Sequence, residues 1–427
     1  MITAVNAWEA LDSRGRPTVA ARVVLADGSA AVALVPSGAS AGSHEAVELR
    51  DGGARFSGRG VRRAVAHVSS TLARRVIGLD PADVDAALSE ADPAPSFSTV
   101  GANAVLAVSL AAARAAATSH GTSLARWLAG EESPLLLPMP MVNILSGGAH
   151  AGRMLDVQDF LVVPVGAGTF AEALEWSAAV RDAATRVALA RGHDQAVLVA
   201  DEGGLGLPLE SNRSALALLT DAIEHAGYTP GSQVAIAIDV AATQFFASGR
   251  YHLAREGREL TADGLVTEIA DWCERFPVVS VEDILAEDDW DGWLQASAVL
   301  GDRIELVGDD LFVTQADRLR RGIDAGIANS VLVKVNQNGL VSGARGVIEL
   351  ARSAGYRTVV SARSGETEDD WLADLAVGWR AGQIKVGSTH RSERTAKWNR
   401  LLQLEATENT TFAGPWRAGR PGEEERQ

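Results

Sequence analysis

The 427-residue chain has the composition of an ordinary soluble globular protein, with 47% hydrophobic and 22% charged residues. This length exceeds what one small core supports, so we expect two domains or one large barrel with an appended domain. The formal net charge of −16 argues against nucleic acid or an anionic membrane as the main partner, although local cations or a metal could still bind a small anionic substrate.

The cysteine content and the start of the chain suggest where the protein works. A single cysteine, Cys273, excludes an internal disulfide and fits a reducing compartment. The first fifteen residues lack the long apolar run of a signal peptide, and no apolar run approaches the length of a membrane span. We therefore expect a cytoplasmic protein without a membrane partner.

Residues 1–135 are predicted to form a smaller α+β domain. Two runs rich in β-branched residues, joined around Asp27, are typical of a β-hairpin. A glycine-rich loop follows, and the alanine-rich stretch from Asn103 to Gly121 predicts a helix with a glycine stop. Three prolines within residues 134–140 mark the expected domain boundary.

Residues 136–416 alternate short apolar runs with amphipathic helical segments. The runs are MVNIL, FLVVP, AVLVA, VAIAI, VVSV, IELV, SVLVK, TVVS and QIKVG. This alternation predicts a parallel sheet with helices outside it. The GxGxxG turn of a Rossmann sheet is missing, and eight or nine strands suit a (β/α)8 barrel. The polar tail, residues 417–427, is expected to be disordered.

Charged residues stand at the carboxyl ends of seven of these predicted strands. In chain order they are Asp201-Glu202, Asp239, Glu282-Asp283, Asp309-Asp310, Lys334, Arg363 and Lys385. In a barrel, all strand carboxyl ends surround one mouth, where active sites lie. A helix-capping acid would be an ordinary explanation for any one strand. Seven strands in a row favour a shared functional site.

The acidic residues in this set predict a magnesium site. Asp239, Glu282 and Asp309 end three successive strands, so they should be neighbours, and oxygen ligands without clustered cysteine or histidine favour Mg²⁺ over zinc. A purely structural network of buried acids and lysines is the alternative. Lys334 and Lys385 would lie opposite these acids in the same mouth, where a lysine beside the metal could act as a general base, with Glu202 as the complementary acid. The set suits proton abstraction next to a carboxylate, with the metal stabilising an ene-diolate.

Several longer motifs resemble those of the enolase family. They are LDSRGRPTV, VPSGASAGSHEA, VADEGG, AIDVAA, SVEDILAEDDWDGW, LVGDDLFVT, KVNQ, SGETEDD and RSERTAKWN. They occur in enolase order from Leu11 to about Asn399 and so cover nearly the whole chain. The resemblance implies an enolase-type barrel behind an N-terminal α+β domain, and a magnesium-dependent hydro-lyase that converts 2-phosphoglycerate to phosphoenolpyruvate. A lysine base assisted by magnesium is already known for this superfamily.

The resemblance also implies two magnesium ions per active site. Asp239, Glu282 and Asp309 would hold the tighter ion, which binds the substrate carboxylate. Ser40, in the glycine-rich loop, would bind a second ion that also touches the phosphate. An enolate dianion needs concentrated positive charge, which two divalent ions and nearby lysines supply.

The remaining roles follow from the same motifs. Lys334 would take the proton from carbon 2, and Glu202 would protonate the hydroxyl that leaves carbon 3. Lys385 would help to hold the carboxylate end, while Arg363 and Ser364 would bind the phosphate. The further substrate-binding residues, from a closing loop and the strand after it, are His150, Gln158 and Asp159.

Five positions depart from the family pattern near the expected site. Ala362 stands where the family has histidine, and Asp159 is one methylene shorter than the family's glutamate. Ser146 replaces an asparagine, Gln244 replaces a glutamate, and Arg153 is an additional cation in the closing loop. The first two changes would open space at one end of the pocket. Arg153 would add positive charge there if its loop closes inward, whereas facing solvent is the ordinary alternative.

These departures suggest a hypothesis about the substrate. It would resemble 2-phosphoglycerate but carry a larger, more anionic group on phosphorus, such as the phosphonoformyl ester dehydrated by carboxyphosphonoenolpyruvate synthase in phosphinate antibiotic pathways. Neutral drift in a working glycolytic enzyme is the alternative. In both cases the partner is a small anionic phospho- or phosphono-glycerate.

A second set of departures concerns assembly. Enolases are typically dimers with arginine–glutamate pairs across the interface. The matching positions here are Trp8, Ala20, Gln403 and Ala406, so both members of each pair are replaced. Exposed ion pairs contribute little stability, and apolar contacts such as Trp8 could maintain the interface. We expect a homodimer with a changed interface.

Two other classes of function remain as alternatives. Racemases and cycloisomerases of the superfamily usually place Lys-x-Lys on the strand where this chain has Asp201-Glu202, which argues against them. A non-catalytic binding protein could keep the fold, but Lys334, Glu202 and the acidic metal ligands are all present.

Overall fold

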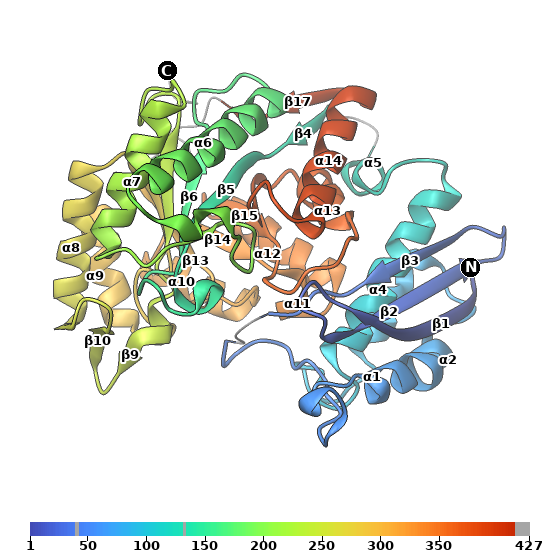
Figure 1. The fold of residues 1–427 in the computed structure, drawn as a ribbon. Coiled ribbons are helices and arrows are strands. Elements are labelled where there is room, and N and C mark those ends of the chain that lie inside the picture. Colours follow the sequence, from blue (N-terminus) through green and yellow to red (C-terminus); the bar gives the residue numbers. More distant parts are fainter. Residues whose placement is uncertain (39–41, 131–133, 415–427) are drawn as a thin grey trace.

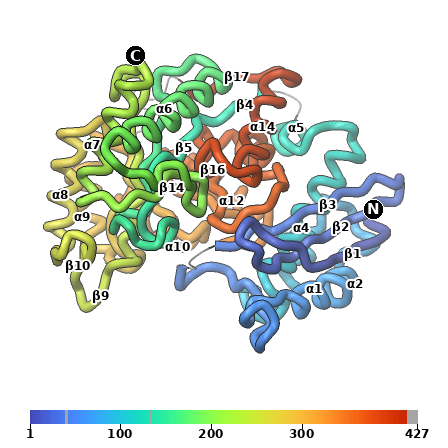
Figure 2. Tube along the Cα trace, in the orientation of Figure 1, coloured from blue at the N-terminus to red at the C-terminus, as the bar shows by residue number. Residues whose placement is uncertain are grey.

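The computed structural model describes residues 1–38, 42–130 and 134–414, which form a smaller N-terminal domain beside a barrel (Figure 1). The chain trace shows the same arrangement, with the N-terminal strands lying apart from the helices of the first barrel half (Figure 2). The predicted metal ligand Ser40 and the predicted disordered tail, residues 417–427, lie outside the described residues.

The N-terminal domain is built on a sheet of three antiparallel strands, β1 (Ile2–Leu11), β2 (Pro17–Leu25) and β3 (Ala30–Leu34). The predicted hairpin is confirmed, because β2 and β3 pair across the turn at Asp27. Helix α4 (Ala102–Ser119) packs against β2 and β3. Its length and hydropathy would suffice for a membrane span, but 83% of it is buried inside the protein, as is typical of a core helix. The shorter helices are α1 (Arg62–His67), α2 (Ala73–Val76), α3 (Val84–Ser89) and α5 (Leu124–Ala129).

Eight strands close the predicted barrel, since β16 pairs back onto β5. In ring order they are β5 (Met139–Ser146), β6 (Asp159–Val163), β8 (Ala235–Asp239), β12 (Val278–Glu282), β13 (Glu305–Gly308), β14 (Ser330–Val333), β15 (Arg357–Ser361) and β16 (Gly382–Gly387). A cluster of buried apolar side chains from these strands, including Met141, Leu161 and Leu332, is separate from the main core. The barrel interior is therefore packed, as in other barrels of this class.

Helices cover the outside of the barrel (Figure 1). They are α6 (Phe170–Ala190), α7 (Asn212–His225), α8 (Ala262–Arg275), α9 (Trp290–Leu300), α10 (Ala316–Ala325), α12 (Val341–Ser353), α13 (Trp371–Gly378) and α14 (Ser392–Thr407). The one-turn helix α11 (Val335–Asn338) follows β14 and packs against α4 and α12. Two small sheets complete the structure, formed by β4 (Leu135–Leu137) with β17 (Thr410–Phe412), and by β9 (Phe246–Ala247), β10 (Arg250–Leu253) and β11 (Arg258–Leu260).

The expectation of an entirely parallel barrel sheet is wrong at β6, which runs antiparallel to both β5 and β8. The connection from β5 to β6, residues 147–158, contains only a 3-10 turn at Gly148–Ala151. Antiparallel strands can be joined by such a connection, whereas parallel neighbours need a crossover that usually contains a helix. The barrel therefore begins β5, β6, α6, α7, β8 and alternates regularly only afterwards.

The run AVLVA, residues 196–200, is not a barrel strand. Its first two residues belong to a 3-10 turn at Asp194–Val197, and Val197 and Leu198 are 71% and 67% exposed. The nearby strand β7 (Leu205–Gly206) pairs only with β5, outside the ring. A short apolar run does not by itself distinguish a strand from other structures. Glu202 consequently reaches the mouth from a loop rather than from a strand end.

The N-terminal domain contacts the barrel next to the loop that follows β15. Ser37 forms a β-bridge with Gly365, and the amide of Ser13 donates to the carbonyl oxygen of Glu366 at 2.7 Å. Two segments far apart in the sequence thus meet at the mouth of the barrel, and residues of both domains lie there.

Candidate active site

Three carboxylates lie together at the carboxyl ends of neighbouring strands. Asp239 ends β8 and Glu282 ends β12, where the two residues are register partners. Asp309 directly follows β13, the next strand of the ring. Asp239, Glu282 and Asp309 are 2%, 2% and 6% exposed. The barrel ring thus buries three acidic groups at the ends of three successive strands.

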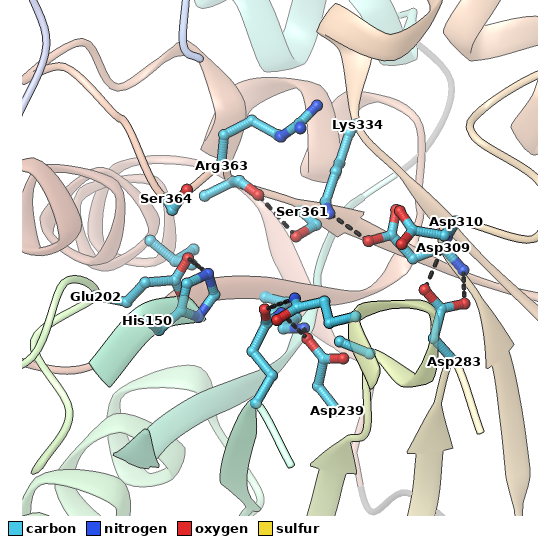
Figure 3. A pocket seen from close by; sticks show the side chains of 16 residues that line it. His150, Glu202, Asp239, Asp283, Asp309, Asp310, Lys334, Ser361, Arg363 and Ser364 are labelled. Carbon is cyan, nitrogen blue, oxygen red and sulfur yellow. Dashed lines mark hydrogen bonds and ion pairs between the residues drawn. The ribbon is translucent and has the colours of Figure 1, made fainter. Parts of the chain in front are cut away.

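Two lysines contact these carboxylates. The Nζ atom of Lys385 lies 2.8 Å from Asp239 Oδ2 and 2.6 Å from Glu282 Oε2. Lys334 Nζ donates to Asp309 Oδ2 (Figure 3). Burial alone would lower the pKa of each amine, but the neighbouring carboxylates outweigh it and raise the pKa of Lys334 and, far more, that of Lys385. As the chain stands, both lysines carry their proton.

The acidic cluster fits a divalent cation. The Oε1 atom of Glu282 is buried and has no hydrogen-bond partner among the described residues. Burial and the charge of Asp239 raise the pKa of Glu282 well above its ordinary value. The lysines therefore do not fully compensate this carboxylate, and an orphaned buried oxygen is expensive unless something binds it. Three hard oxygen donors suit Mg²⁺.

A histidine and two further acids lie next to this cluster: His150 and Glu202 line the pocket, and Asp159 is the register partner of Asp239. His150 Nδ1 lies 2.7 Å from Asp159 Oδ2. Its Nε2 lies 3.8 Å from Glu202 Oε1 (Figure 3). Although burial would lower the pKa of His150, the carboxylates of Asp159 and Glu202 raise it to about 9. We assign the proton of the His150–Asp159 pair to the imidazole, whose ordinary pKa exceeds that of a carboxyl group.

Several cations surround the carboxylate of Glu202. Burial would raise its pKa, but His150, Arg394 and the two lysines together lower it. Gln158 donates from Nε2 to Asp239 Oδ2 at 3.0 Å and so connects this side of the pocket to the acidic cluster. Both Glu202 and Gln158 line the pocket.

Arg363 and Ser364 follow β15 at the end of the pocket next to the N-terminal domain. Arg363 Nη1 lies 3.0 Å from Glu45 Oε2 and 3.1 Å from Asn336 Oδ1. Arg14 of the N-terminal domain donates to the hydroxyl oxygen of Ser364 at 3.3 Å. Cations from both domains therefore lie together at this end of the pocket.

Comparisons with known proteins agree with this geometry. Residues 2–128 match the family described as "Enolase, N-terminal domain", and residues 134–418 match "Enolase, C-terminal TIM barrel domain". The chain is 50% identical over 408 residues to the protein named "Enolase" of Acidothermus cellulolyticus, which covers 95% of this chain and 94% of that protein. The chain belongs to the enolase family. The expectation of an enolase-type carbon–oxygen hydro-lyase is thereby confirmed.

The departures from the enolase pattern take different places in the structure. Ala362 lines the pocket beside Arg363 with only a methyl group. Asp159 is fully buried, lies outside the pocket lining, and accepts from Asn143 Nδ2 at 2.6 Å as well as from His150. Arg153 is exposed and borders a separate cavity of about 240 Å³. Arg153 therefore adds no charge to the pocket. It faces solvent, as the ordinary alternative expects.

Two more departures lie at the edge of this enolase-family site. Ser146 is fully buried and its hydroxyl contacts the side chain of Asn143 at 3.1 Å, which in turn binds Asp159. Gln244 lines the pocket, donates to Gln158, and accepts from the amide of Ala149 at 3.3 Å. Gln244 therefore supports a neighbour in the pocket lining, whereas Ser146 supports a buried pair behind it.

The structure also adds residues to the enolase-family site that sequence reasoning did not assign. Asp283 adopts a left-handed φ of 44°, and its carboxylate accepts from the amides of Asp309 and Asp310 at 2.9 Å each. Gln337 donates from Nε2 to Asp309 Oδ1 at 3.0 Å. Both residues orient Asp309. The only signal in the sequence was a second acid directly after a strand, and its role depends on backbone geometry that a sequence does not reveal.

Proposed function

We propose that this chain catalyses the magnesium-dependent dehydration of 2-phosphoglycerate to phosphoenolpyruvate. The observation that carries the proposal is that Lys334 and Glu202 line one pocket together with Asp239, Asp309 and Arg363. An amine, a carboxyl group, a cation site and an anion site are the groups that this elimination needs. Membership of the enolase family and the relative named Enolase support the choice of substrate.

In this proposal Asp239, Glu282 and Asp309 hold the metal. When bound, divalent cations supply positive charge that compensates these carboxylates and stabilises the negative charge that develops on the substrate carboxylate. A second magnesium ion at Ser40 stays a prediction, because Ser40 lies outside the described residues.

Lys334 is the proposed general base for the proton on carbon 2. A base must present a neutral amine, and the contact with Asp309 favours the ammonium form. Burial acts in the opposite direction and favours the neutral amine. Compensating the charge of Asp309 would therefore lower the pKa of Lys334 and prepare it to accept the proton.

Glu202 is the proposed acid for the hydroxyl that leaves carbon 3. Its lowered pKa means that the carboxyl group alone holds its proton weakly. His150 has a pKa of about 9 and is therefore protonated at neutral pH. Its Nε2 atom lies 3.8 Å from Glu202 Oε1. We therefore propose that Glu202 delivers the proton with His150 beside it as the reservoir.

The other side chains would orient the substrate. Lys385, between Asp239 and Glu282, would bind the substrate carboxylate, with Gln158 next to it. Arg363 and Ser364 would bind the phosphate. A substrate bound at both its carboxylate and its phosphate is already oriented for the elimination of water, which lowers the entropic cost of the reaction.

A larger phosphorus substituent is a second candidate, which a specific observation favours. Ala362 leaves the wall beside Arg363 without a ring, where the family pattern has histidine. The expectation that Asp159 also opens space at this end is wrong, because Asp159 is fully buried outside the pocket lining. The extra room supports a 2-phosphonoformylglycerate substrate, whose dehydration gives carboxyphosphonoenolpyruvate in phosphinate antibiotic biosynthesis.

One assay decides between the two substrates. Purified protein with Mg²⁺ is given 2-phosphoglycerate and its phosphonoformyl analogue in parallel, and formation of the enol double bond is followed for each. We expect turnover of 2-phosphoglycerate. Faster turnover of the analogue would favour the second candidate, and turnover of neither would refute both. A homodimer acting in the cytoplasm completes the proposal, supported by resemblance to enolases alone.

A further inference from the structure

Helix α14 carries two buried cations that the proposed reaction does not use. Arg394 and Lys397 are 0% and 1% exposed, and the described lining of the active-site pocket contains neither. Burying a charged side chain is costly unless hydrogen bonds satisfy it. The partners of these two residues therefore indicate what they do.

Arg394 binds main-chain oxygens of two segments that line the pocket. Its Nη1 donates to the carbonyl oxygen of Arg363 at 2.7 Å and to that of Val386 at 3.0 Å. Its Nη2 donates to the carbonyl oxygen of Ser364 at 2.6 Å. One guanidinium thus joins the two anion-binding residues to the strand that carries Lys385.

Lys397 acts on the same segment through a neighbouring acid. Its Nζ donates to the carbonyl oxygen of Thr367 at 2.6 Å and lies 2.9 Å from Glu366 Oε2. The other oxygen of Glu366, Oε1, accepts from the amide of Arg363 at 3.0 Å. The main chain of Arg363 is therefore held at its carbonyl by Arg394 and at its amide by the Glu366–Lys397 pair.

The packing around Arg394 leaves little freedom. Gly387 has a φ of +115°, and a Cβ atom there would lie 2.9 Å from Arg394 Cδ and 2.9 Å from the carbonyl oxygen of Glu202. The amide of Ser388 donates to that same oxygen at 2.9 Å. The backbone of Glu202 and the aliphatic part of Arg394 thus pack against one glycine.

We propose that Arg394 and Lys397 are positioning residues that hold the anion-binding segment Arg363–Ser364 in place relative to Lys385 and Glu202. The proposal rests on the proposed function in one respect, namely that this segment binds the phosphate. Neither residue touches the substrate. Both act through main-chain atoms, so the charge alone does not suffice and the geometry of the donors matters.

The test compares three variants of the full-length protein. Arg394→Lys keeps the charge but loses the planar fork, and Lys397→Met keeps the length but loses the charge. Arg400→Lys is the matched control, because Arg400 lies on the same helix and binds Asp374 at 2.7 and 2.8 Å, away from the pocket. For each protein we measure the dissociation constant of inorganic phosphate, KM, kcat and the thermal midpoint.

We expect the phosphate dissociation constant and KM to rise about tenfold or more in Arg394→Lys and Lys397→Met, since small misplacements of binding groups are costly. kcat should fall by a smaller factor, and Arg400→Lys should change only the thermal midpoint. Unchanged phosphate binding in a folded variant would overturn the proposal. If neither Arg394→Lys nor Lys397→Met folds while Arg400→Lys does, the proposal is also overturned, because the two residues would then be needed only for folding. The phosphate dissociation constant is measured without turnover. If the wild type does not convert 2-phosphoglycerate, the proposed function is refuted, but the test of Arg394 and Lys397 can still be carried out.

Discussion

Lys334 and Glu202 should be separable by what each variant still does. Lys334→Ala removes the base, so hydrogen–deuterium exchange at carbon 2 and dehydration should both fall by about 10²-fold or more. Glu202→Gln removes the acid, so dehydration should fall similarly while exchange at carbon 2 persists. Proton NMR of the substrate in deuterated buffer measures both. Exchange that survives in Lys334→Ala would remove lysine from the mechanism.

Asp159 should determine the pH range in which His150 stabilises the fold. The pKa of His150 is raised to about 9 from an ordinary 6.5, since Asp159 and Glu202 outweigh its burial. A raised pKa in the folded protein contributes stability that is full below pH 6.5 and is lost as the pH rises through about 9. Asp159→Asn should lower the pKa of His150 and flatten the pH dependence of the unfolding free energy across this window.

The measurement combines urea unfolding between pH 6 and pH 9.5 with an NMR titration of His150. Asp159→Glu, which restores the carboxylate with one more methylene, serves as the control and should keep a raised pKa. Equal pH slopes for the wild type and Asp159→Asn would show that another group dominates this range.

Ala362 should set the size limit at the anion end of the pocket. Ala362→His places a ring beside Arg363, where the wild type has only a methyl group. If the pocket accepts a larger substituent because of this space, the substitution should lower kcat/KM for the phosphonoformyl analogue by about tenfold, since an overfilled pocket costs roughly 1–3 kcal/mol. kcat/KM for 2-phosphoglycerate should hold or rise. Equal losses for both substrates would instead indicate general damage to the site.

At the level of elements, the sequence predicted correctly where several barrel strands end, but not the direction in which β6 runs. Asp239, Glu282 and Asp309 follow apolar runs that are barrel strands, so their meeting at one mouth follows from the fold class. The direction of β6 depends on the length and shape of the segment before it, which periodicity does not encode. The run at residues 196–200 shows the same limit, because an apolar pattern records side-chain character but not the availability of a pairing partner.

The parts of the site that the sequence did not predict depend on contacts through the backbone. Arg394 binds three carbonyl oxygens, which every residue possesses, so no motif identifies its partners. Asp283 likewise acts on backbone amides from a left-handed conformation. The pairing of His150 with Asp159 joins the 3-10 turn after β5 to the start of β6, and their closeness follows only from the antiparallel return.

Helix α6 should tolerate loss of its cap without loss of chemistry. Thr169 accepts from the amide of Glu172 at 3.1 Å, and Glu172 in turn accepts from the amide of Gly168 at 2.7 Å. This capping arrangement satisfies helix-end amides on the outside of the barrel. Thr169→Ala should lower the unfolding free energy by about 1 kcal/mol and leave kcat and KM unchanged. Urea denaturation measures the loss, Thr169→Ser should restore most of it, and a change in kcat would mean that α6 affects the site.

Across the whole molecule, the N-terminal domain completes the anion end of the barrel. Glu45 and Arg14 come from the first domain, and they contact Arg363 and Ser364 respectively. Gln337 also donates to Glu45 at 3.3 Å while it binds Asp309. A shift of one domain against the other would therefore move the proposed metal ligand Asp309 and the proposed phosphate ligands Arg363 and Ser364 together.

The surface of β1 carries the prediction about assembly. Trp8 is 41% exposed and pairs in register with Ala20, which is fully buried, so the indole is the available apolar contact at this position. Gln403 and Ala406 are exposed on α14 and carry no charge. If a homodimer forms here, it relies on Trp8 rather than on ion pairs, and buried tryptophans commonly contribute 2 kcal/mol or more to an interface. Trp8→Glu should weaken dimerisation at least about 30-fold, the equivalent of roughly 2 kcal/mol.

Sedimentation velocity across a dilution series measures the dimer dissociation constant for each protein. Leu294→Glu is the control, because Leu294 is 50% exposed on α9, on the outside of the barrel. It should introduce the same charge without changing the association. A wild type that sediments only as a monomer would exclude the dimer. If Trp8→Glu and Leu294→Glu dimerise equally well, the interface lies elsewhere, and the loss of the family's ion pairs has moved the contact instead of replacing it.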